Sequence, residues 1–118
     1  MATFQYSPSN EKKGFPKGET FSFTNSVAYA EGSIVSKILL RNDKGNITMF
    51  SFDEGESLSE HTAPFDALVH IFDGEAEIII DGVSHRVQTG ESILMPANIP
   101  HAVKANVRMK MLLTMIKG

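Results

Sequence analysis

Cysteine is missing altogether from the 118 residues of this chain. Without it the protein can form neither disulfide bridges nor thiolate metal sites. The absence suits a reducing cytoplasm, where disulfides do not persist. We therefore expect a cytoplasmic protein.

Basic residues and long apolar runs are also scarce. The chain has 11 Lys and Arg against 14 Asp and Glu, which gives a formal net charge of −3 and a pI near 5.7. Nucleic acids and anionic membrane surfaces both attract basic patches, so we expect neither as a partner. No segment approaches the roughly 20 apolar residues of a membrane span. Residues 1–19 contain no apolar run of the signal-peptide type.

Helical periodicity is absent too, since no segment of ten or more residues carries an apolar stripe at helical spacing. Turn residues recur about every eight to twelve positions instead, which is typical of a sandwich or barrel. A chain of 13.0 kDa with 42% apolar residues fits one domain. We predict an all-β domain over residues 21–118. Residues 1–20, interrupted by Pro and Gly, are expected to form a flexible arm or to pack on a partner subunit.

The expected strands follow from β-branched residues, alternation and turn dipeptides. Strand-like pieces begin near Phe21, Phe23 and Val27. Pro64 cannot donate to a ladder, so it suggests an edge strand or a bulge. Further strands are expected at residues 33–41, 47–52, 61–63, 67–72, 75–80, 83–87, 92–95, 101–105 and 108–116.

The last expected strand has one apolar face. Its apolar residues are separated by residues such as Arg108 and Lys110, and they are Met109, Met111, Leu113 and Met115. This face belongs in the core or at a dimer interface. An apolar strand face in so small a barrel leads us to expect a homodimer.

Two stretches of the chain share one plan: a glycine, a few residues of strand, and a histidine just beyond. Residues 55–75 contain His61, and residues 90–105 contain His101. Two strand pairs built in this way can bring the two histidines together, although forty positions separate them. We expect a barrel around that meeting point.

These two motifs resemble those of the cupin superfamily, whose fold is a jelly-roll barrel, also called a double-stranded β-helix. The resemblance covers about residues 33–116 and implies a small single-domain cupin. Asn98 stands where the family usually has glycine, and Ala105 stands where it usually has asparagine. The residues that match are Gly55, His61 and Gly74 in the first motif and Gly90, Pro96 and His101 in the second.

The resemblance also implies a metal held by three histidines and a carboxylate, and here the chain departs from the family. His61 and His101 stand at the first and last of these positions. Ala63 takes the place of the second histidine and Ala67 that of the carboxylate. Alanine has no lone pair to donate, so half of the ligands are missing and the metal site is incomplete.

Asp66 is the candidate for a third ligand. Strict alternation points its side chain away from His61, whereas a bulge at Pro64 would reverse its direction. With His61 and His101 it would then hold a divalent ion, Zn, Ni, Fe or Cu, with open positions. The alternatives are that Asp66 faces solvent from a turn, and that the two histidines bond to water, to each other or to a ligand.

The other two histidines are not expected in the site. His85 lies between Val83 and Val87 and is expected to be a packed side chain. His70 is expected on the face opposite to Ala67 and Val69.

Methyl groups in place of large polar ligands leave apolar volume at the centre of the barrel. We therefore predict a small, largely apolar pocket with two imidazoles at one end. The alternative is that its residues, together with Ala105, pack against one another and leave no cavity. The predicted pocket residues are His61, Ala63, Ala67, Val69, Met95, His101 and Val103.

Three functions remain open at this point. The first is a binding protein that takes a small organic ligand, with or without a metal. The second, implied by the resemblance, is a metal-dependent oxygenase or isomerase that uses His61, Asp66 and His101. The third is a stand-alone sensor domain that acts through a partner.

Overall fold

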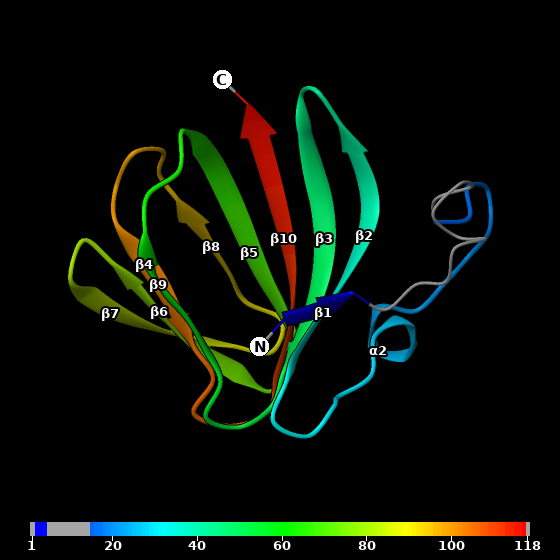
Figure 1. Ribbon diagram of the computed structural model, residues 1–118, viewed down its shortest axis with the longest axis horizontal. Helices are drawn as coiled ribbons and strands as arrows, with labels where there is room; N and C mark the ends of the chain where they lie inside the picture. The colour runs from blue at the N-terminus through cyan, green and yellow to red at the C-terminus, as the bar shows by residue number, and fades with distance from the viewer. Residues whose placement is uncertain (1, 5–14, 118) are drawn as a thin grey trace.

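The computed structural model describes the backbone of residues 2–4 and all of residues 15–117. Two sheets face each other, as Figure 1 shows, and all strand pairs but one are antiparallel. The six-stranded sheet has the order β1-β2-β3-β10-β5-β8, and the four-stranded sheet has the order β4-β9-β6-β7. The prediction of an all-β jelly-roll barrel is therefore confirmed.

The strand expected at residues 61–63 is misplaced, because β4 ends at His61 and residues 62–64 lie in the loop that follows it. Apart from β1, which was not expected, the other strands begin and end within two residues of the expected positions, and β6 and β8 match them fully. The strands are β1 (Ala2–Phe4), β2 (Ile34–Asn42), β3 (Gly45–Phe52), β4 (Ser57–His61), β5 (Phe65–Asp73), β6 (Glu75–Ile80), β7 (Val83–Gln88), β8 (Ser92–Met95), β9 (His101–Lys104) and β10 (Met109–Lys117).

The β6–β7 connection shows why these short strands can follow one another so closely. Ile80 pairs with Val83, so only Asp81 and Gly82 form the turn. Both have positive φ, at 50° and 78°. Such a turn has the twist that joins antiparallel strands, and Asp-Gly is among the dipeptides that adopt it most readily.

The inner faces of the two sheets form the main core. Met109 and Met111 of β10 are buried in it, and Leu113 and Met115 pack against it. The apolar face of the last strand therefore lies in the core. The buried members of this core are Ile34, Phe52, Ala67, Val69, Ile71, Ala76, Ile78, Val87, Met95, Val103, Ala105, Met109 and Met111.

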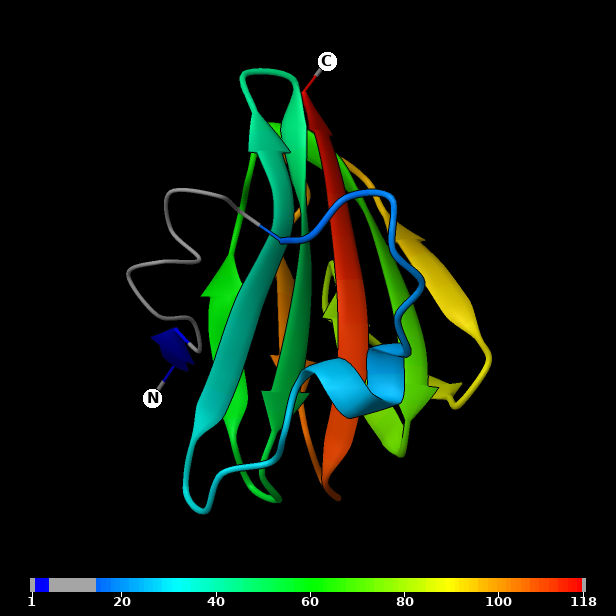
Figure 2. The ribbon, with the colours of Figure 1, turned by 90° about the vertical axis from the view of Figure 1, so that its right-hand side faces the viewer.

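A second, smaller core covers the outer face of the six-stranded sheet. Val27, Val35 and Met49 are buried there. The chain that precedes β2 supplies its cover, including the one-turn helix α2 (Phe23–Ser26). Figure 2 shows α2 lying over β10 on this outer face.

The expectation of strand-like pieces at Phe23 and Val27 is wrong, because this segment turns as α2 instead. Phe23 begins α2, and Val27, with φ −136° and ψ 126°, is the extended residue that follows its last turn. Both pack into the second core. The segment therefore buries its apolar side chains without joining a sheet.

The expected N-terminal arm, residues 1–20, falls largely outside the described residues. Of its described parts, Ala2–Phe4 form β1, which pairs in parallel with β2. Phe15 packs against the second core and contacts Phe21 edge to face, with ring centroids 4.7 Å apart. These parts of the arm are attached to the barrel of their own chain.

The two sheets splay apart at one end, at the top of Figure 1, and approach each other at the other. The splayed end is the mouth of the barrel, where β4 and β10 end and β5 and β9 begin. Within the described residues, no helix has the length and apolar character needed to span a membrane.

Candidate functional site

A β-bulge turns His61 toward the inside of the barrel. On β4, Leu58 pairs with Val103 of β9 and His61 pairs with His101, so residues 59 and 60 together oppose Ala102 alone. Leu58 packs against the inner core. Without the extra residue, strict alternation from Leu58 would point His61 outward. The bulge lies here and not at Pro64, which falls in the loop between β4 and β5.

His61 and His101 meet at the mouth. Their ring centroids lie 4.4 Å apart and the rings cross at 66°, edge to face. His101 is buried, whereas His61 is exposed at the rim. The two-sheet fold thus brings together the two histidines that the motifs single out.

Backbone carbonyl groups fix the orientation of both rings. His61 Nδ1 lies 2.9 Å from the carbonyl oxygen of Ser59, and His101 Nδ1 lies 3.1 Å from that of Ile99. A carbonyl oxygen only accepts, so Nδ1 carries the proton in each bond. In the neutral rings the Nε2 atoms therefore keep their lone pairs for a ligand.

Asp66 is held away from the histidines by the neighbouring loop. Its Oδ1 accepts a hydrogen bond of 2.9 Å from the backbone N–H of Ala97, and the side chain is exposed. Its neighbour Ala67 points into the core, so the alternation of β5 places Asp66 on the outer face. The bulge that would have reversed its direction is absent from the start of β5.

The described residues do not fit the metal site that the resemblance implies. Among them, no group of three or more His, Cys, Asp or Glu side chains could hold a metal ion. The proposed set of His61, Asp66 and His101 is therefore not assembled. Two imidazole nitrogens alone leave a transition metal short of the four donors of a usual site.

The backbone conformation of Asn98 explains how it can replace the glycine that the family usually has at this position. Its φ is +64°, a left-handed conformation that glycine adopts freely and asparagine adopts more readily than most residues. In this conformation its N–H donates to the carbonyl of Ala63 at 2.8 Å. The bond ties the two loops that flank the histidines to each other.

His70 and His85 lie outside the pair. His70 Nδ1 is 2.8 Å from Ser92 Oγ, and His70 pairs in register with Leu112, which packs in the second core. His85 pairs with the buried Ile78 and so lies on the inner face, but on the edge strand β7. β6 separates it from His101.

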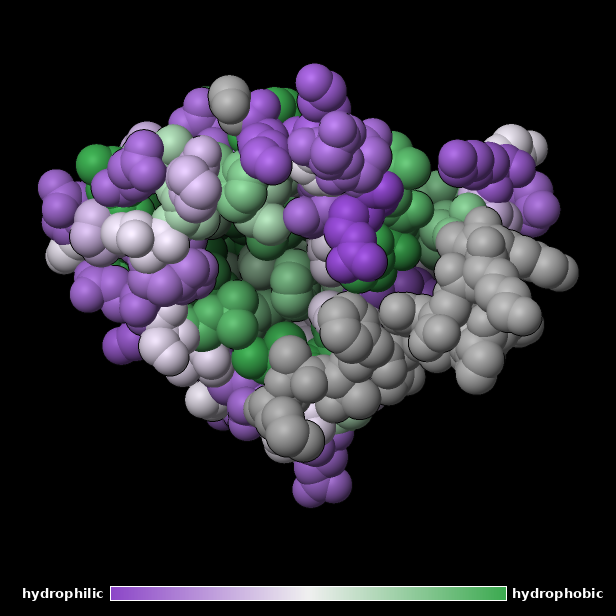
Figure 3. All heavy atoms as spheres, turned by 45° about the horizontal axis from the view of Figure 1, so that its top comes forward, coloured by the Kyte–Doolittle hydropathy of each residue, from purple (hydrophilic) through white to green (hydrophobic). Residues whose placement is uncertain are grey.

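The predicted pocket residues divide into two layers. Val69 is completely buried, and Ala67, Met95 and Val103 are nearly so. They form the packed floor below the histidines, whereas Ala63 sits at the rim in the β4–β5 loop and is half-buried. Figure 3, viewed into the mouth, shows a hollow lined by apolar residues.

The predicted pocket residues do not include the partly buried apolar side chains around the main core. The partly buried apolar side chains that pack on the main core are Phe50, Leu58, Ile80, Ile93, Leu113 and Met115. Alternation along β3 and β10 could have found Phe50, Leu113 and Met115, because they share a face with buried neighbours. The position of Leu58 depends on the bulge and has no such signal.

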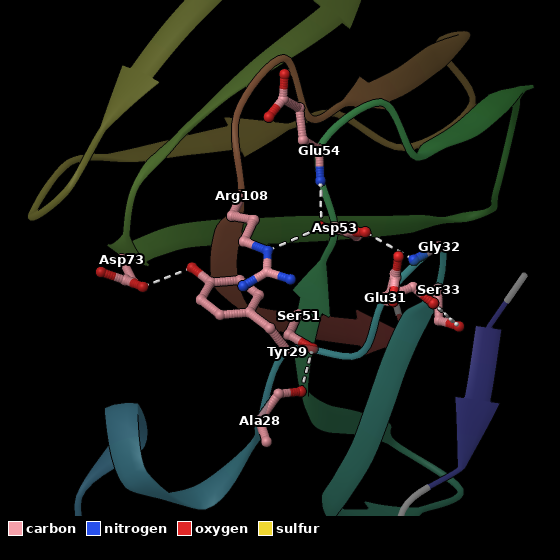
Figure 4. Close-up of polar contacts among 10 residues, drawn as sticks. All are labelled: Ala28, Tyr29, Glu31, Gly32, Ser33, Ser51, Asp53, Glu54, Asp73 and Arg108. Carbon is pink, nitrogen blue, oxygen red and sulfur yellow. Dashed lines mark hydrogen bonds and ion pairs between the residues drawn. The ribbon is translucent and has the colours of Figure 1, made fainter.

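A network of polar and charged side chains lies at the other end of the barrel (Figure 4). Tyr29 donates a hydrogen bond of 2.5 Å to Asp73 Oδ2, and the cationic groups of Arg108 and Lys110 lie 5.1 Å and 4.8 Å from its ring centroid. Burial and this hydrogen bond raise the pKa of Tyr29 well above its usual range. The cluster fastens the segment before β2 to the barrel and is remote from the histidines.

Comparison with known proteins places the fold in a family. The model of the cupin domain family matches residues 48–116. No protein with a curated description matches the chain.

Three solved structures illustrate the similarity. A conserved protein of unknown function from Streptococcus pyogenes is 36% identical over 88% of this chain and 91% of that one, with a TM-score of 0.85. A cupin superfamily protein from Desulfitobacterium hafniense is 29% identical over 88% and 95%, with a TM-score of 0.82. A cupin 2 conserved barrel domain protein from Leptotrichia buccalis is 47% identical over 82% of this chain but only 47% of its own length, with a TM-score of 0.80. The fold, the two motifs and the family match together show that this chain belongs to the cupin superfamily.

Proposed function

We propose that this cupin barrel binds a small, largely apolar organic molecule in its mouth, with His61 and His101 as polar contacts. The observation that carries the proposal is the pair of oriented imidazoles at the rim of an apolar hollow. Small-molecule sites commonly combine apolar walls with a few fixed polar groups.

The chemistry of the two rings supports binding more than metal catalysis. Each ring uses Nδ1 on a backbone carbonyl and offers Nε2 as an acceptor when neutral. A hydroxyl or an amide N–H group can donate to such an atom. The alanines at positions 63 and 67 offer no further donor to a metal, so nothing in this geometry favours the enzyme alternative.

Ligand-induced thermal stabilisation tests the proposal. Benzamide and hexanamide are suitable neutral probes, and benzoate and hexanoate are suitable acidic ones. A ligand at about 100 times its Kd stabilises the native state by about 2.7 kcal/mol, so a true ligand raises Tm in a concentration-dependent way. If no probe raises Tm or binds in calorimetry, the proposal is wrong.

A substitution that fills the predicted pocket tests whether the ligand binds there. Ala67 lies in the floor, and Ala67→Leu places three additional carbon atoms below the histidines. We expect it to abolish the rise in Tm, whereas Ala28→Leu, at an exposed position before β2, leaves it unchanged. If Ala67→Leu lowers the Tm of the free protein, His61→Gln provides a milder change at an exposed side chain.

Elemental analysis separates binding from the enzyme alternative. Protein purified without chelator or histidine tag should carry no stoichiometric transition metal. About one equivalent per chain, lost in His61→Ala and His101→Ala, would contradict the incomplete site and favour a metal-dependent enzyme.

A further inference from the structure

Two basic residues, Arg41 and Lys117, occupy inward-facing strand positions at the mouth of the barrel. Arg41 of β2 pairs with Asn46 of β3, and Asn46 pairs with Met115 of β10. Met115 packs on the main core, so this row of positions faces inward. Arg41 therefore occupies an inward position at the end of β2, and its side chain is exposed.

Lys117 occupies a second such position. It lies two residues beyond Met115 on β10, on the same face, and pairs with Phe65 at the start of β5. Its side chain is also exposed. Arg41 and Lys117 both belong to the six-stranded sheet, whereas His61 and His101 belong to the four-stranded sheet on the other side of the mouth.

No acidic residue of the described strands balances these cations from an inward-facing position. The acids near the mouth lie elsewhere: Asp43 and Asp81 in turns, Glu60 in the bulge, and Asp66 on the outer face with its carboxylate on Ala97 N–H. Lys44 adds a third cation in the β2–β3 turn, next to Asp43.

From this asymmetry we infer that the ligand is a small organic acid bound as its carboxylate anion, with Arg41 and Lys117 as the residues that select its charge. The inference rests on the proposed function, because it assigns the ligand class of the same mouth. The apolar body enters the hollow, and the carboxylate stays at the rim near the two cations. Neutral imidazoles with free Nε2 lone pairs do not attract a carboxylate, so the cations must supply this selectivity.

Matched acid and amide pairs test the inference by isothermal titration calorimetry. Benzoate and benzamide have similar shape and differ in charge, as do hexanoate and hexanamide. At pH 8, above the range in which histidines usually titrate, we expect each acid to bind about tenfold more tightly than its amide at low salt. The preference should fall as salt is raised, because the cations are exposed.

Charge-removing variants identify the residues responsible. We expect Arg41→Gln and Lys117→Gln each to weaken benzoate binding about three- to tenfold and to leave benzamide binding unchanged. Lys104→Gln is the control, since Lys104 is exposed on β9 and pairs with Ser57 and Glu77 on the outer face. It removes the same charge without touching the inner rim.

The outcomes separate the two proposals. If acids and amides bind equally in all variants, or amides bind more tightly, the inference is overturned while binding in the mouth stands. If no acid and no amide binds, the proposed function fails and the inference fails with it. A preference for acids that Lys104→Gln reduces as much as Arg41→Gln would also overturn the role given to the rim.

Discussion

At the scale of single residues, Asp53 ties the start of β2 to the start of β10. Its Oδ1 accepts a hydrogen bond of 2.8 Å from Arg108 Nε, and its Oδ2 accepts one of 2.6 Å from the N–H of Gly32. The Arg108 guanidinium, together with the N–H groups of Gly32 and Glu54, lowers the pKa of Asp53 to about 2. The ionised form is therefore the one that the fold prefers.

This lowered pKa predicts a loss of stability in acid. The folded pKa of about 2 lies below the usual aspartate pKa of 3.8, so the stability that ionised Asp53 contributes is fully present above pH 3.8. It is lost as the pH falls through the folded pKa. We expect Asp53→Asn to melt at a lower temperature than the native protein at pH 6, and the difference to shrink between about pH 4 and pH 2.

Circular dichroism melts at several pH values measure this difference. Glu54→Gln is the control, because Figure 4 shows the Glu54 carboxylate pointing away from the network. It should lower Tm little at any pH. A gap between Asp53→Asn and the native protein that stays constant down to pH 2 would contradict the role of the charge.

Two Asp-Gly turns have the same sequence and different tolerance for a side chain. A Cβ at Gly74 would lie 2.1 Å from the carbonyl oxygen of Arg108, whereas a Cβ at Gly82 meets nothing within 4 Å. Both glycines have positive φ, at 71° and 78°. Alanine therefore carries the cost of a left-handed conformation at both sites and a backbone collision only at position 74.

We expect Gly74→Ala to lower the free energy of unfolding by roughly 2–4 kcal/mol, since the conformational cost and the overpacking cost add. Gly82→Ala should cost only about 1–2 kcal/mol. Urea denaturation of the two variants measures the difference. Equal losses would show that β10 moves away from position 74 without cost.

At the scale of secondary-structure elements, the sequence predicts strands and turns well but not irregularities within them. The limits of β6 and β8 follow from alternation and flanking turn residues. The bulge at residues 59–60 has no such signature, yet it decides which way His61 faces. The loss of Asp66 from the expected ligand set has the same origin, because the bulge lies on β4 and not at Pro64.

The segment before β2 acts as a cover for the outer face of the six-stranded sheet. Val27 is buried at 3% exposure and packs with Val35 and Met49. Truncating it removes two methyl groups from this small core. We expect Val27→Ala to lower the free energy of unfolding by about 2 kcal/mol in urea denaturation.

Val107→Ala is the matched control for this element. Val107 is 44% exposed, so the same truncation should cost less than about 0.5 kcal/mol. If the two variants lose equal stability, the segment does not contribute to the cooperative core.

At the scale of the whole molecule, the barrel could be predicted because its signals are repeated and redundant. Alternation, turn dipeptides and two glycine-to-histidine motifs all agree. The depth of the mouth could not be predicted, because it depends on how far the sheets splay. Val69 was expected to line the pocket and has no exposed surface, whereas Leu113 and Met115, assigned from the sequence to the core or a dimer interface, are only partly buried against the core.

The upper part of the outer face of the six-stranded sheet carries a row of mostly apolar residues, several of which remain exposed. The row crosses five strands, and neighbouring members pair in register: Leu40, Ile47, Thr114, Leu68 and Leu94. Leu68 and Leu94 are 41% and 64% exposed, and Ile116 beside them is 63% exposed. An apolar surface of this extent is typical of a protein interface.

The expected homodimer therefore stays a prediction, now with a specific surface. Two copies that pack these rows face to face would form a closed pair, because such a contact uses the same surface on both chains. We expect sedimentation equilibrium to give a mass of about 26 kDa, twice the 13.0 kDa of the chain. Leu94→Glu should shift the equilibrium toward the monomer, because it places a charge in the row, whereas Val107→Glu, in the loop before β10, should not. A native protein that sediments at 13.0 kDa at all concentrations would contradict the dimer.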